Sequence, residues 1–257
     1  MFETIEYEVK ERVSWIRLNR PDKLNAFTFR MNEEVKEAVK KATDDQDVRC
    51  IVITGNGRAF CSGQDLNGVE EGLDHGEMLR TAYNPMVKQI VSSSKPVVAA
   101  INGVAAGAGM SLALACDFRL AHESASFIEA FVHVGLVPDS GSTYFLPRLI
   151  GHAKALELAM LGEKVSAPDA KELGLVTEIF SDEQWEQGIV EFANRLAGLP
   201  PKAAALIKQT LIKSFESSLD EVLESEAVAQ REAGQTNDHI EGIKAFTEKR
   251  KPIFHGS

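Results

Sequence analysis

The chain has few cysteines, and the three present, Cys50, Cys61 and Cys116, are widely spaced. That number and spacing exclude a disulfide framework and a paired-cysteine metal site, and they favour a reducing, cytoplasmic environment. No apolar run approaches the length of a membrane span, and the first residues are too acidic for a signal or transit peptide. The formal net charge of −10 argues against a general nucleic-acid binder, although a local basic cluster can still hold an anionic ligand.

Several catalytic motifs are also missing. The sequence contains no G-x-S-x-G, no complete GxGxxG and no Walker A pattern, which disfavours a hydrolase elbow, dinucleotide binding and nucleotide triphosphate binding. Ser62 and Ser111 neighbour glycine turns, but the nearest histidines, His122 and His133, have no local signature of a serine triad. The six histidines show no metal-ligand spacing, so we expect no bound metal.

What is present indicates an α/β protein. The 257 residues, 44% of them hydrophobic, suffice for one large domain with a substantial core. Residues 5–9 and 13–18 alternate as in a hairpin, residues 31–42 have helical spacing, and residues 77–93 predict a helix kinked at Pro85. Short apolar strands are expected at 50–54, 97–101, 118–121 and 175–180. The alternation of strands and helices predicts largely parallel pairing.

The C-terminal part is predominantly helical. Helical patterns cover 153–161, 167–173, 182–199, 201–215, 219–233 and 238–249. We therefore expect an α/β core over residues 1–198 and a helical region over residues 199–257. Apolar stripes on the last helices fit either a core or an oligomer contact.

Two glycine-rich turns follow strand candidates, at Cys61-Ser-Gly-Gln64 and Gly107-Ala-Gly109. Such turns leave backbone N–H groups unpaired at a helix N-terminus, where they favour a negatively charged oxygen. If the strands bring both turns to one edge of the sheet, their N–H groups can stabilise an enolate. The alternative is that the glycines only allow close packing of strand and helix.

Asp139 is the candidate base, in the turn Gly135-Leu-Val-Pro-Asp-Ser-Gly141. An apolar pocket made by Phe131, Leu136, Val137 and Phe145 would raise the pKa of Asp139 toward that of a useful base. The alternative is a turn or N-cap aspartate. The competitors are Asp117, expected to be a structural hydrogen-bond acceptor, and Asp65, expected to be a loop or cap residue.

Four segments carry a family resemblance. They are Leu18-Asn-Arg-Pro-Asp-Lys-Leu-Asn-Ala26, Gly57-Arg-Ala-Phe-Cys-Ser-Gly-Gln-Asp-Leu66, Lys95-Pro-Val-Val-Ala-Ala-Ile-Asn-Gly-Val-Ala-Ala-Gly-Ala-Gly109 and Ala170-Lys-Glu-Leu-Gly-Leu-Val176. In order and spacing they resemble the crotonase superfamily, the enoyl-CoA hydratases and isomerases. The resemblance implies a spiral of ββα units, a C-terminal helical trimerisation region, and a homotrimer or dimer of trimers. It also implies an acyl-CoA thioester ligand, with coenzyme A as part of the substrate and no other cofactor.

The resemblance also assigns site residues. It places the oxyanion-hole N–H groups on Ser62 and Ala108, and pocket residues at Gly109, Ser111 and Phe131. Residues expected to bind coenzyme A are Lys23, Leu24 and Ala26 along the pantetheine and phosphates, Gly63, Gln64, Asp65 and Leu66 at the adenine end, and Lys249 or Lys251 from a neighbouring subunit.

One departure from the family pattern bears on the chemistry. Hydratases of this family use two glutamates, at positions that here hold Ser111 and Phe131, and Glu129 lies two residues before the second position. The resemblance is particularly close to the family's phenylacetate-pathway isomerases, so we expect an isomerase that shifts a double bond or rearranges a ring epoxide with Asp139 as the single base. Alternatives are a hydratase in which Asp139 or Glu129 holds water alone, and a non-catalytic acyl-CoA-binding subunit paired with a hydratase. The sequence does not identify the acyl group. Aromatic and straight-chain substrates would require different pocket walls, and the region from Asn67 to Tyr83 that would supply these walls is not placed by the sequence.

Overall fold

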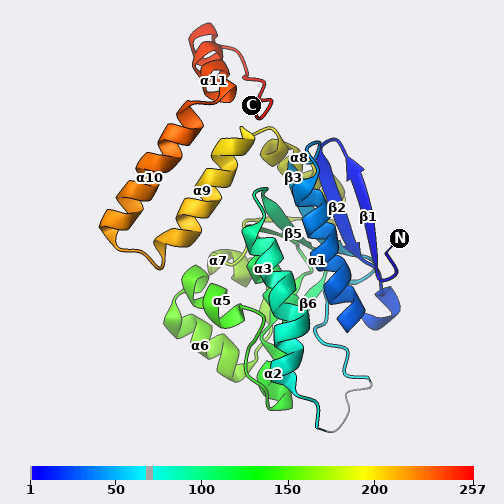
Figure 1. The fold of residues 1–257 in the computed structure, drawn as a ribbon. Helices are drawn as coiled ribbons and strands as arrows, with labels where there is room; N and C mark the ends of the chain where they lie inside the picture. Colours follow the sequence, from blue (N-terminus) through cyan, green and yellow to red (C-terminus); the bar gives the residue numbers. More distant parts are fainter. Residues whose placement is uncertain (1, 68–71) are drawn as a thin grey trace.

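A six-stranded sheet forms the centre of the protein in the computed structural model, which describes residues 2–67 and 72–257. Its strand order is β1-β2-β3-β5-β7-β10 (Figure 1). The strands are β1 (Ile5–Lys10), β2 (Val13–Leu18), β3 (Cys50–Gly55), β5 (Val97–Ile101), β7 (Phe118–His122) and β10 (Glu178–Phe180). β1 and β2 form the expected antiparallel hairpin, with Ile5 opposite Leu18, and every later pairing in this sheet is parallel. The prediction of a mainly parallel α/β core is therefore confirmed.

A second, smaller sheet was not predicted. It has the order β4-β6-β8-β9, with β4 (Ala59–Cys61), β6 (Val104–Ala106), β8 (Ser126–Ile128) and β9 (Val165–Ser166). Strands of two or three residues are too short to show an alternating pattern. Because β3, β5 and β7 enter the large sheet and β4, β6 and β8 follow them into the small one, the chain repeats a ββα unit, as the family resemblance implied.

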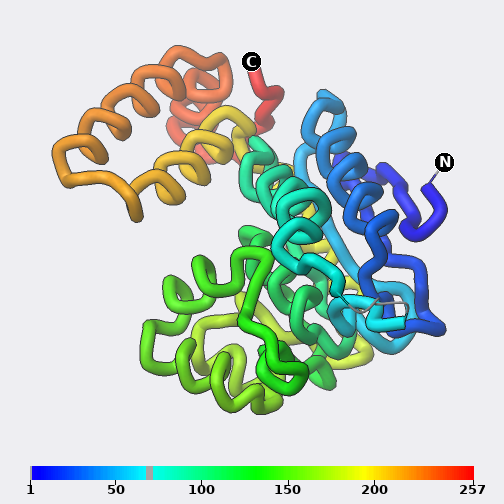
Figure 2. The backbone as a smooth tube through the Cα atoms, turned by 60° about the horizontal axis from the view of Figure 1, so that its bottom comes forward, coloured from blue at the N-terminus to red at the C-terminus, as the bar shows by residue number. Residues whose placement is uncertain are grey.

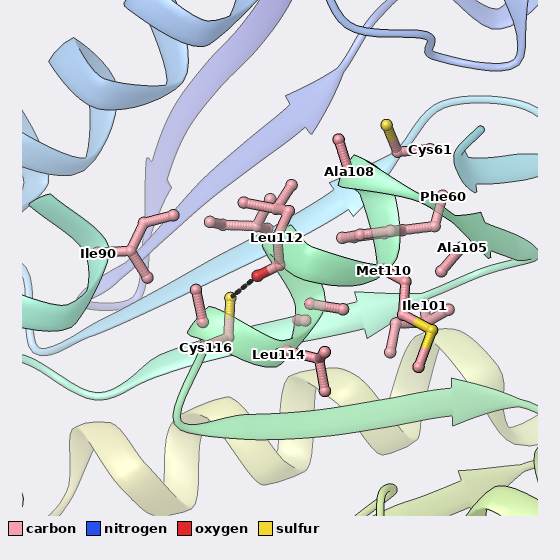
Figure 3. Packing of buried hydrophobic residues seen from close by; sticks show 14 of the residues in the cluster. Phe60, Cys61, Ile90, Ile101, Ala105, Ala108, Met110, Leu112, Leu114 and Cys116 are labelled. Carbon is pink, nitrogen blue, oxygen red and sulfur yellow. Dashed lines mark hydrogen bonds between the residues drawn. The ribbon is translucent and has the colours of Figure 1, made fainter. Parts of the chain in front are cut away.

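Helix α4 (Ala108–Ala115) is buried on every side. Figure 3 shows Ala108, at the start of this helix, beside Cys61 at the end of β4. Met110, Leu112 and Leu114 pack into the surrounding core. This complete burial fixes the position of the helix N-terminus relative to both sheets.

Helices cover both faces of the large sheet. α1 (Phe29–Asp44), capped by Thr28, and α3 (Asn84–Ser92) pack together on one face, and α8 (Trp185–Ala197) covers the other (Figure 1). The helix expected over 77–93 is present as one continuous helical run, from α2 (His75–Met78) through a π-helical turn (Leu79–Tyr83) into α3. Pro85 lies inside this run, in the first turn of α3, and the π-helical turn before it was not predicted.

The connections after β8 contain three more helices and several turns. The helices are α5 (Ser142–Ile150), α6 (His152–Leu161) and α7 (Ala167–Glu172), and 3-10 turns occur at Ala130–Val134 and Asp182–Gln184. A further 3-10 turn, Pro21–Lys23, lies between β2 and α1. α5 was not predicted. None of the helices in the described part of the chain combines the length and the apolar character that spanning a membrane requires.

The last three helices project from the body of the protein (Figures 1 and 2). They are α9 (Pro201–Ser214), α10 (Leu219–Gly234) and α11 (Asn237–Glu248), and the expected boundary at residue 199 lies between α8 and α9. Lys208 of α9 donates to the Asp117 carboxylate at 2.8 Å, and the same carboxylate accepts the Val97 N–H at 2.8 Å. Asp117 is thus the structural hydrogen-bond acceptor that the sequence predicted.

Candidate active site

A cavity of about 200 Å³ lies where the loop after β4, the turn before α4 and the Pro-Asp turn converge. Its remaining walls come from α2, the π-helical turn and the 3-10 turn Ala130–Val134. The lining residues include Ser62, Gly63, Gln64, Leu66, His75, Met78, Leu79, Tyr83, Gly107, Ala108, Phe131, Leu136, Val137 and Asp139. The two glycine turns singled out in the sequence therefore meet at one cavity, and Asp139 faces the same space.

Two backbone N–H groups are free to bind an oxygen in this cavity. Ala108 opens α4 after Gly107, so its N–H has no carbonyl one turn earlier to accept it. Gln64 N–H donates to no acceptor in the described part of the chain, although the N–H of Asp65 and the carbonyl of Gly63 both bond to Phe27. Together they form a pair of donors at the N-terminus of a buried helix, which favours a negatively charged oxygen.

Gly63 allows the loop after β4 to approach the turn before α4 closely. Its φ is +100°, and a Cβ there would lie 3.0 Å from the Ala106 carbonyl oxygen and 3.6 Å from the Ala108 nitrogen. A side chain at this position would force the loop away from the turn before α4. The glycine therefore has a geometric role in the site.

The expectation for Ser62 needs correction. Its N–H donates to the carbonyl of Leu24 at 3.0 Å, so it is already used within the protein. The free donor of this loop lies two residues later, on Gln64. The expected loop does line the cavity, but the Leu24 carbonyl that accepts the Ser62 N–H comes from a distant part of the chain.

Asp139 is held by its own turn. Its carbonyl accepts Ser142 N–H at 2.9 Å and Ser111 Oγ–H at 3.0 Å, and its carboxylate oxygen Oδ1 accepts Ser140 Oγ–H at 2.8 Å. Burial raises the pKa of this half-buried carboxyl above its ordinary value, while the Ser140 hydrogen bond and the charge of His75 lower it. A carboxylate with a raised pKa, fixed at the wall of an apolar cavity, is suited to accept a proton from carbon.

The walls around Asp139 are apolar. Phe131 is buried, at 7% exposure, and Leu136, Val137, Met78 and Leu79 complete this side of the cavity. Val137 is 77% exposed at the mouth, so part of this apolar surface is open to a ligand. The expected walls Phe131, Leu136 and Val137 lie here.

Three expected pocket residues do not line the cavity. Phe145 instead lines a separate hollow of about 330 Å³ between α9 and the core. Ser111 is fully buried behind Asp139, where its hydroxyl bonds to the Gly107 and Asp139 carbonyls. Gly109 is packed so tightly that a Cβ would lie 2.2 Å from the Cys61 carbonyl oxygen. Ser111 and Gly109 therefore shape the site from behind.

His75 and Tyr83 line the cavity without having been predicted individually. The Tyr83 hydroxyl, in a buried side chain, bonds to Oε1 of Gln64, and burial raises the pKa of Tyr83. The sequence indicated only that the region from Asn67 to Tyr83 would supply walls. Of that region, residues 68–71 lie outside the described residues.

Most of the residues expected to bind coenzyme A lie at or beside the cavity. Lys23, Leu24, Ala26 and Asp65 lie in or beside the loops at the cavity, with Lys23 exposed, and Gly63, Gln64 and Leu66 line it. Asp65 is paired with Arg20 at 2.8 Å, and Arg20 also donates to the Ala26 carbonyl at 2.6 Å, so Asp65 fastens the two loops together. Hydrogen bonding to Arg20 and to Asn67 lowers the pKa of Asp65.

Lys249 and Lys251 are remote from the cavity within one chain. They follow α11, at the opposite end of the molecule from α2 (Figures 1 and 2). Any contact with bound coenzyme A would therefore have to be made in another subunit, as the sequence analysis expected. Both side chains are exposed.

The chain is similar to known proteins over nearly its whole length. The sequence pattern of the enoyl-CoA hydratase/isomerase family matches residues 8–257. The chain is 43% identical to a Rhodobacter capsulatus protein named "Probable enoyl-CoA hydratase" over 99% of both chains. It is 41% identical to the 1,2-epoxyphenylacetyl-CoA isomerase of Escherichia coli over the full length of both. It also resembles the crystal structure of an enoyl-CoA hydratase from Bacillus anthracis, with a TM-score of 0.93, 33% identity, and coverage of 99% of this chain and 100% of the other.

Proposed function

The chain belongs to the enoyl-CoA hydratase/isomerase family, and within this family we propose that it is an acyl-CoA isomerase. In this proposal it moves a double bond from the 3-enoyl to the 2-enoyl position, or rearranges a ring-epoxide phenylacetyl-CoA. Asp139 is the single base. Coenzyme A belongs to the substrate, and the reaction needs no further cofactor.

The proposed reaction begins at the two free N–H groups. The thioester oxygen accepts hydrogen bonds from Gln64 N–H and Ala108 N–H, which stabilise the negative charge that develops on it. Asp139 removes a proton from the α-carbon, and the electron pair of the C–H bond delocalises into an enolate. The protonated Asp139 returns that proton to the γ-carbon, so the double bond moves and Asp139 regains its charge.

The observation that carries the proposal is the single carboxylate at the cavity. Among the described lining residues, Asp139 is the one acidic side chain, and Phe131 and the buried Ser111 occupy the positions where the family's hydratases carry glutamates. A proton shift requires one group that takes and returns a proton. Holding and activating a water molecule is helped by a second polar group, and the apolar walls disfavour it.

The ring-epoxide substrate is supported by one relative and by the walls. The Escherichia coli relative is named for the isomerisation of 1,2-epoxyphenylacetyl-CoA. Phe131, Met78 and Leu79 provide an apolar surface of the kind that an aromatic or cyclic acyl group would contact.

Hydration is the second candidate function, favoured by the name of the Rhodobacter capsulatus relative. It would require Asp139 to hold the water alone, because Glu129 is buried and does not line the cavity. A third possibility is an acyl-CoA-binding subunit without catalysis.

A single-turnover assay in deuterated water, read by chromatography and mass spectrometry, separates these three functions. We expect 3-enoyl-CoA to become its isomer 2-enoyl-CoA without a gain of water, and deuterium to enter only where protonated Asp139 exchanges with the solvent before it returns the proton. Efficient addition of water to 2-enoyl-CoA would contradict the isomerase proposal and favour the hydratase. Ligand binding with no isomerisation, no addition of water and no deuterium entry would indicate the non-catalytic subunit.

We also propose that the C-terminal helices mediate assembly into a homotrimer or a dimer of trimers. Leu219 and Leu223 of α10 and Phe246 of α11 are 72%, 53% and 86% exposed, respectively. A second copy of the chain would bury this apolar surface, as the family resemblance implies. We expect Phe246→Glu to lower the assembled mass measured by light scattering, whereas the matched control Glu248→Gln on the same helix leaves it unchanged. An unchanged mass in Phe246→Glu and in Leu223→Glu would contradict this interface.

A further inference from the structure

Glu129 is a buried carboxyl group that the proposed reaction does not use. It follows β8, and the residue is 1% exposed. Its Oε1 accepts the Ser142 hydroxyl at 2.7 Å, whereas its buried Oε2 has no hydrogen-bond partner in the described part of the chain. An ionised carboxylate would lose its hydration here with one hydrogen bond in return, so the site favours the neutral acid.

Ser142 connects this buried acid to the base. Its hydroxyl donates to Glu129, and its backbone N–H donates to the Asp139 carbonyl at 2.9 Å. Ser111 donates to the same carbonyl at 3.0 Å. A change in the charge of Glu129 therefore acts on the turn that carries Asp139, both through the field and through Ser142.

We propose that Glu129 is a positioning residue that keeps a proton up to about neutral pH, so that it and Asp139 carry one negative charge between them. The inference rests on the proposed function, in which Asp139 is the base. Two neighbouring carboxyl groups resist being ionised together, and the less buried one loses its proton first. Asp139 is half-buried and faces the cavity, whereas Glu129 is enclosed.

The pKa directions of the two groups agree with this order. Burial raises the pKa of Glu129 to about 7, the Ser142 hydrogen bond lowers it, and the negative charge of Asp139 raises it. Burial also raises the pKa of Asp139, whereas the Ser140 hydrogen bond and the charge of His75 lower it.

Three histidines lie in the segments around Glu129 and Asp139. His133, on the 3-10 turn after Glu129, bonds to the Gly162 carbonyl at 2.9 Å. His152 of α6 lines a hollow on the far side of Ser142, and His75 lies across the active-site cavity near Asp139. Asp139 is the charged group whose field acts on Glu129.

Ionisation of Glu129 should reduce activity. The reaction builds negative charge on the substrate, and a second negative charge close to Asp139 opposes that step. Activity should therefore rise with pH as Asp139 ionises and fall again as Glu129 ionises, giving a bell-shaped profile.

The first test is the pH dependence of kcat/KM for the wild type, Glu129→Gln and Ser142→Ala. We expect the wild type to lose about tenfold or more between about pH 7 and about pH 9, and Glu129→Gln to lose this alkaline decline. Ser142→Ala removes a hydrogen bond that favours the ionised form, so the decline should move to higher pH. A purely structural role would lower activity at every pH without moving the profile. An alkaline decline that persists in Glu129→Gln, or that moves to lower pH in Ser142→Ala, would overturn the proposal.

The second test does not depend on catalysis. The infrared C=O stretch of a protonated carboxyl group can be followed against pH in the ligand-free protein. We expect a band at neutral pH that is lost in Glu129→Gln and that titrates at lower pH in Asp139→Asn, because the charge that raises the Glu129 pKa is gone. A missing band, or titration unchanged in Asp139→Asn, would overturn the coupling even if the isomerase proposal held. If the isomerase proposal failed, this titration would still decide whether Glu129 holds its proton.

Discussion

Asp139→Asn is expected to reduce turnover by about a thousandfold or more while leaving coenzyme A binding intact. Loss of a general base commonly costs between about a hundredfold and ten thousandfold, and about 4 kcal/mol in barrier corresponds to a thousandfold. The amide has nearly the same shape as the carboxyl group, so the Ser140 hydroxyl can still donate to an oxygen, and the carbonyl bonds to Ser111 and Ser142 are unaffected. The loss should therefore lie in kcat rather than in KM.

The measurement pairs turnover with ligand binding. Turnover of 3-enoyl-CoA and deuterium exchange at the α-carbon are followed together with calorimetric binding of a non-reactive acyl-CoA. Asp182→Asn is the matched control, because that side chain is 93% exposed and remote from the cavity lining. We expect the control to keep wild-type turnover. Near wild-type turnover in Asp139→Asn would show that another group takes the proton, with His75 and Tyr83 as the other titratable side chains among the described lining residues.

The long elements of the fold were predictable because their patterns repeat. Helix α1 shows its apolar face over sixteen residues, and the β1–β2 hairpin alternates over most of its length. The small sheet was not predictable, because its strands have two or three residues and depend on pairing between distant segments. The π-helical turn before α3 was also missed: Pro85 indicates a disturbed helix, but the sequence does not show that the turn before it is π-helical.

The site was predictable at the level of loops and less so at the level of atoms. The glycine spacing identified both turns that meet at the cavity, and the Pro-Asp turn identified Asp139 as a residue of its lining. Which N–H of the first loop is free depends on the Leu24 carbonyl, whose approach to Ser62 is a tertiary contact. The same limit applies to Glu129: the sequence shows only that it lies two residues before the second glutamate position of the family, whereas the structure shows an enclosed acid bonded to Ser142.

Replacing Ala108 with its α-hydroxy acid analogue, lactic acid, is expected to lower kcat by about a hundredfold to a thousandfold. The resulting ester has an oxygen where the amide had its N–H, so one donor to the thioester oxygen is removed and no atom is added. Loss of one such donor typically costs about 3 to 4 kcal/mol in the barrier. Because Ala108 is the first residue of α4, its N–H makes no hydrogen bond within the helix, and the fold should be little affected.

The same replacement at the first loop decides which N–H completes the pair. The α-hydroxy analogue at Gln64 should reduce kcat as strongly as that at Ala108. The analogue at Ser62 should leave kcat nearly unchanged and lower the unfolding free energy by about 1 kcal/mol, because that N–H donates to the Leu24 carbonyl rather than to a ligand. A large loss of kcat at Ser62 with none at Gln64 would mean that the loop rearranges when substrate binds. Equal, small losses at Gln64 and Ala108 would contradict an enolate stabilised between the two turns, because the negative oxygen would then have to be stabilised by other donors.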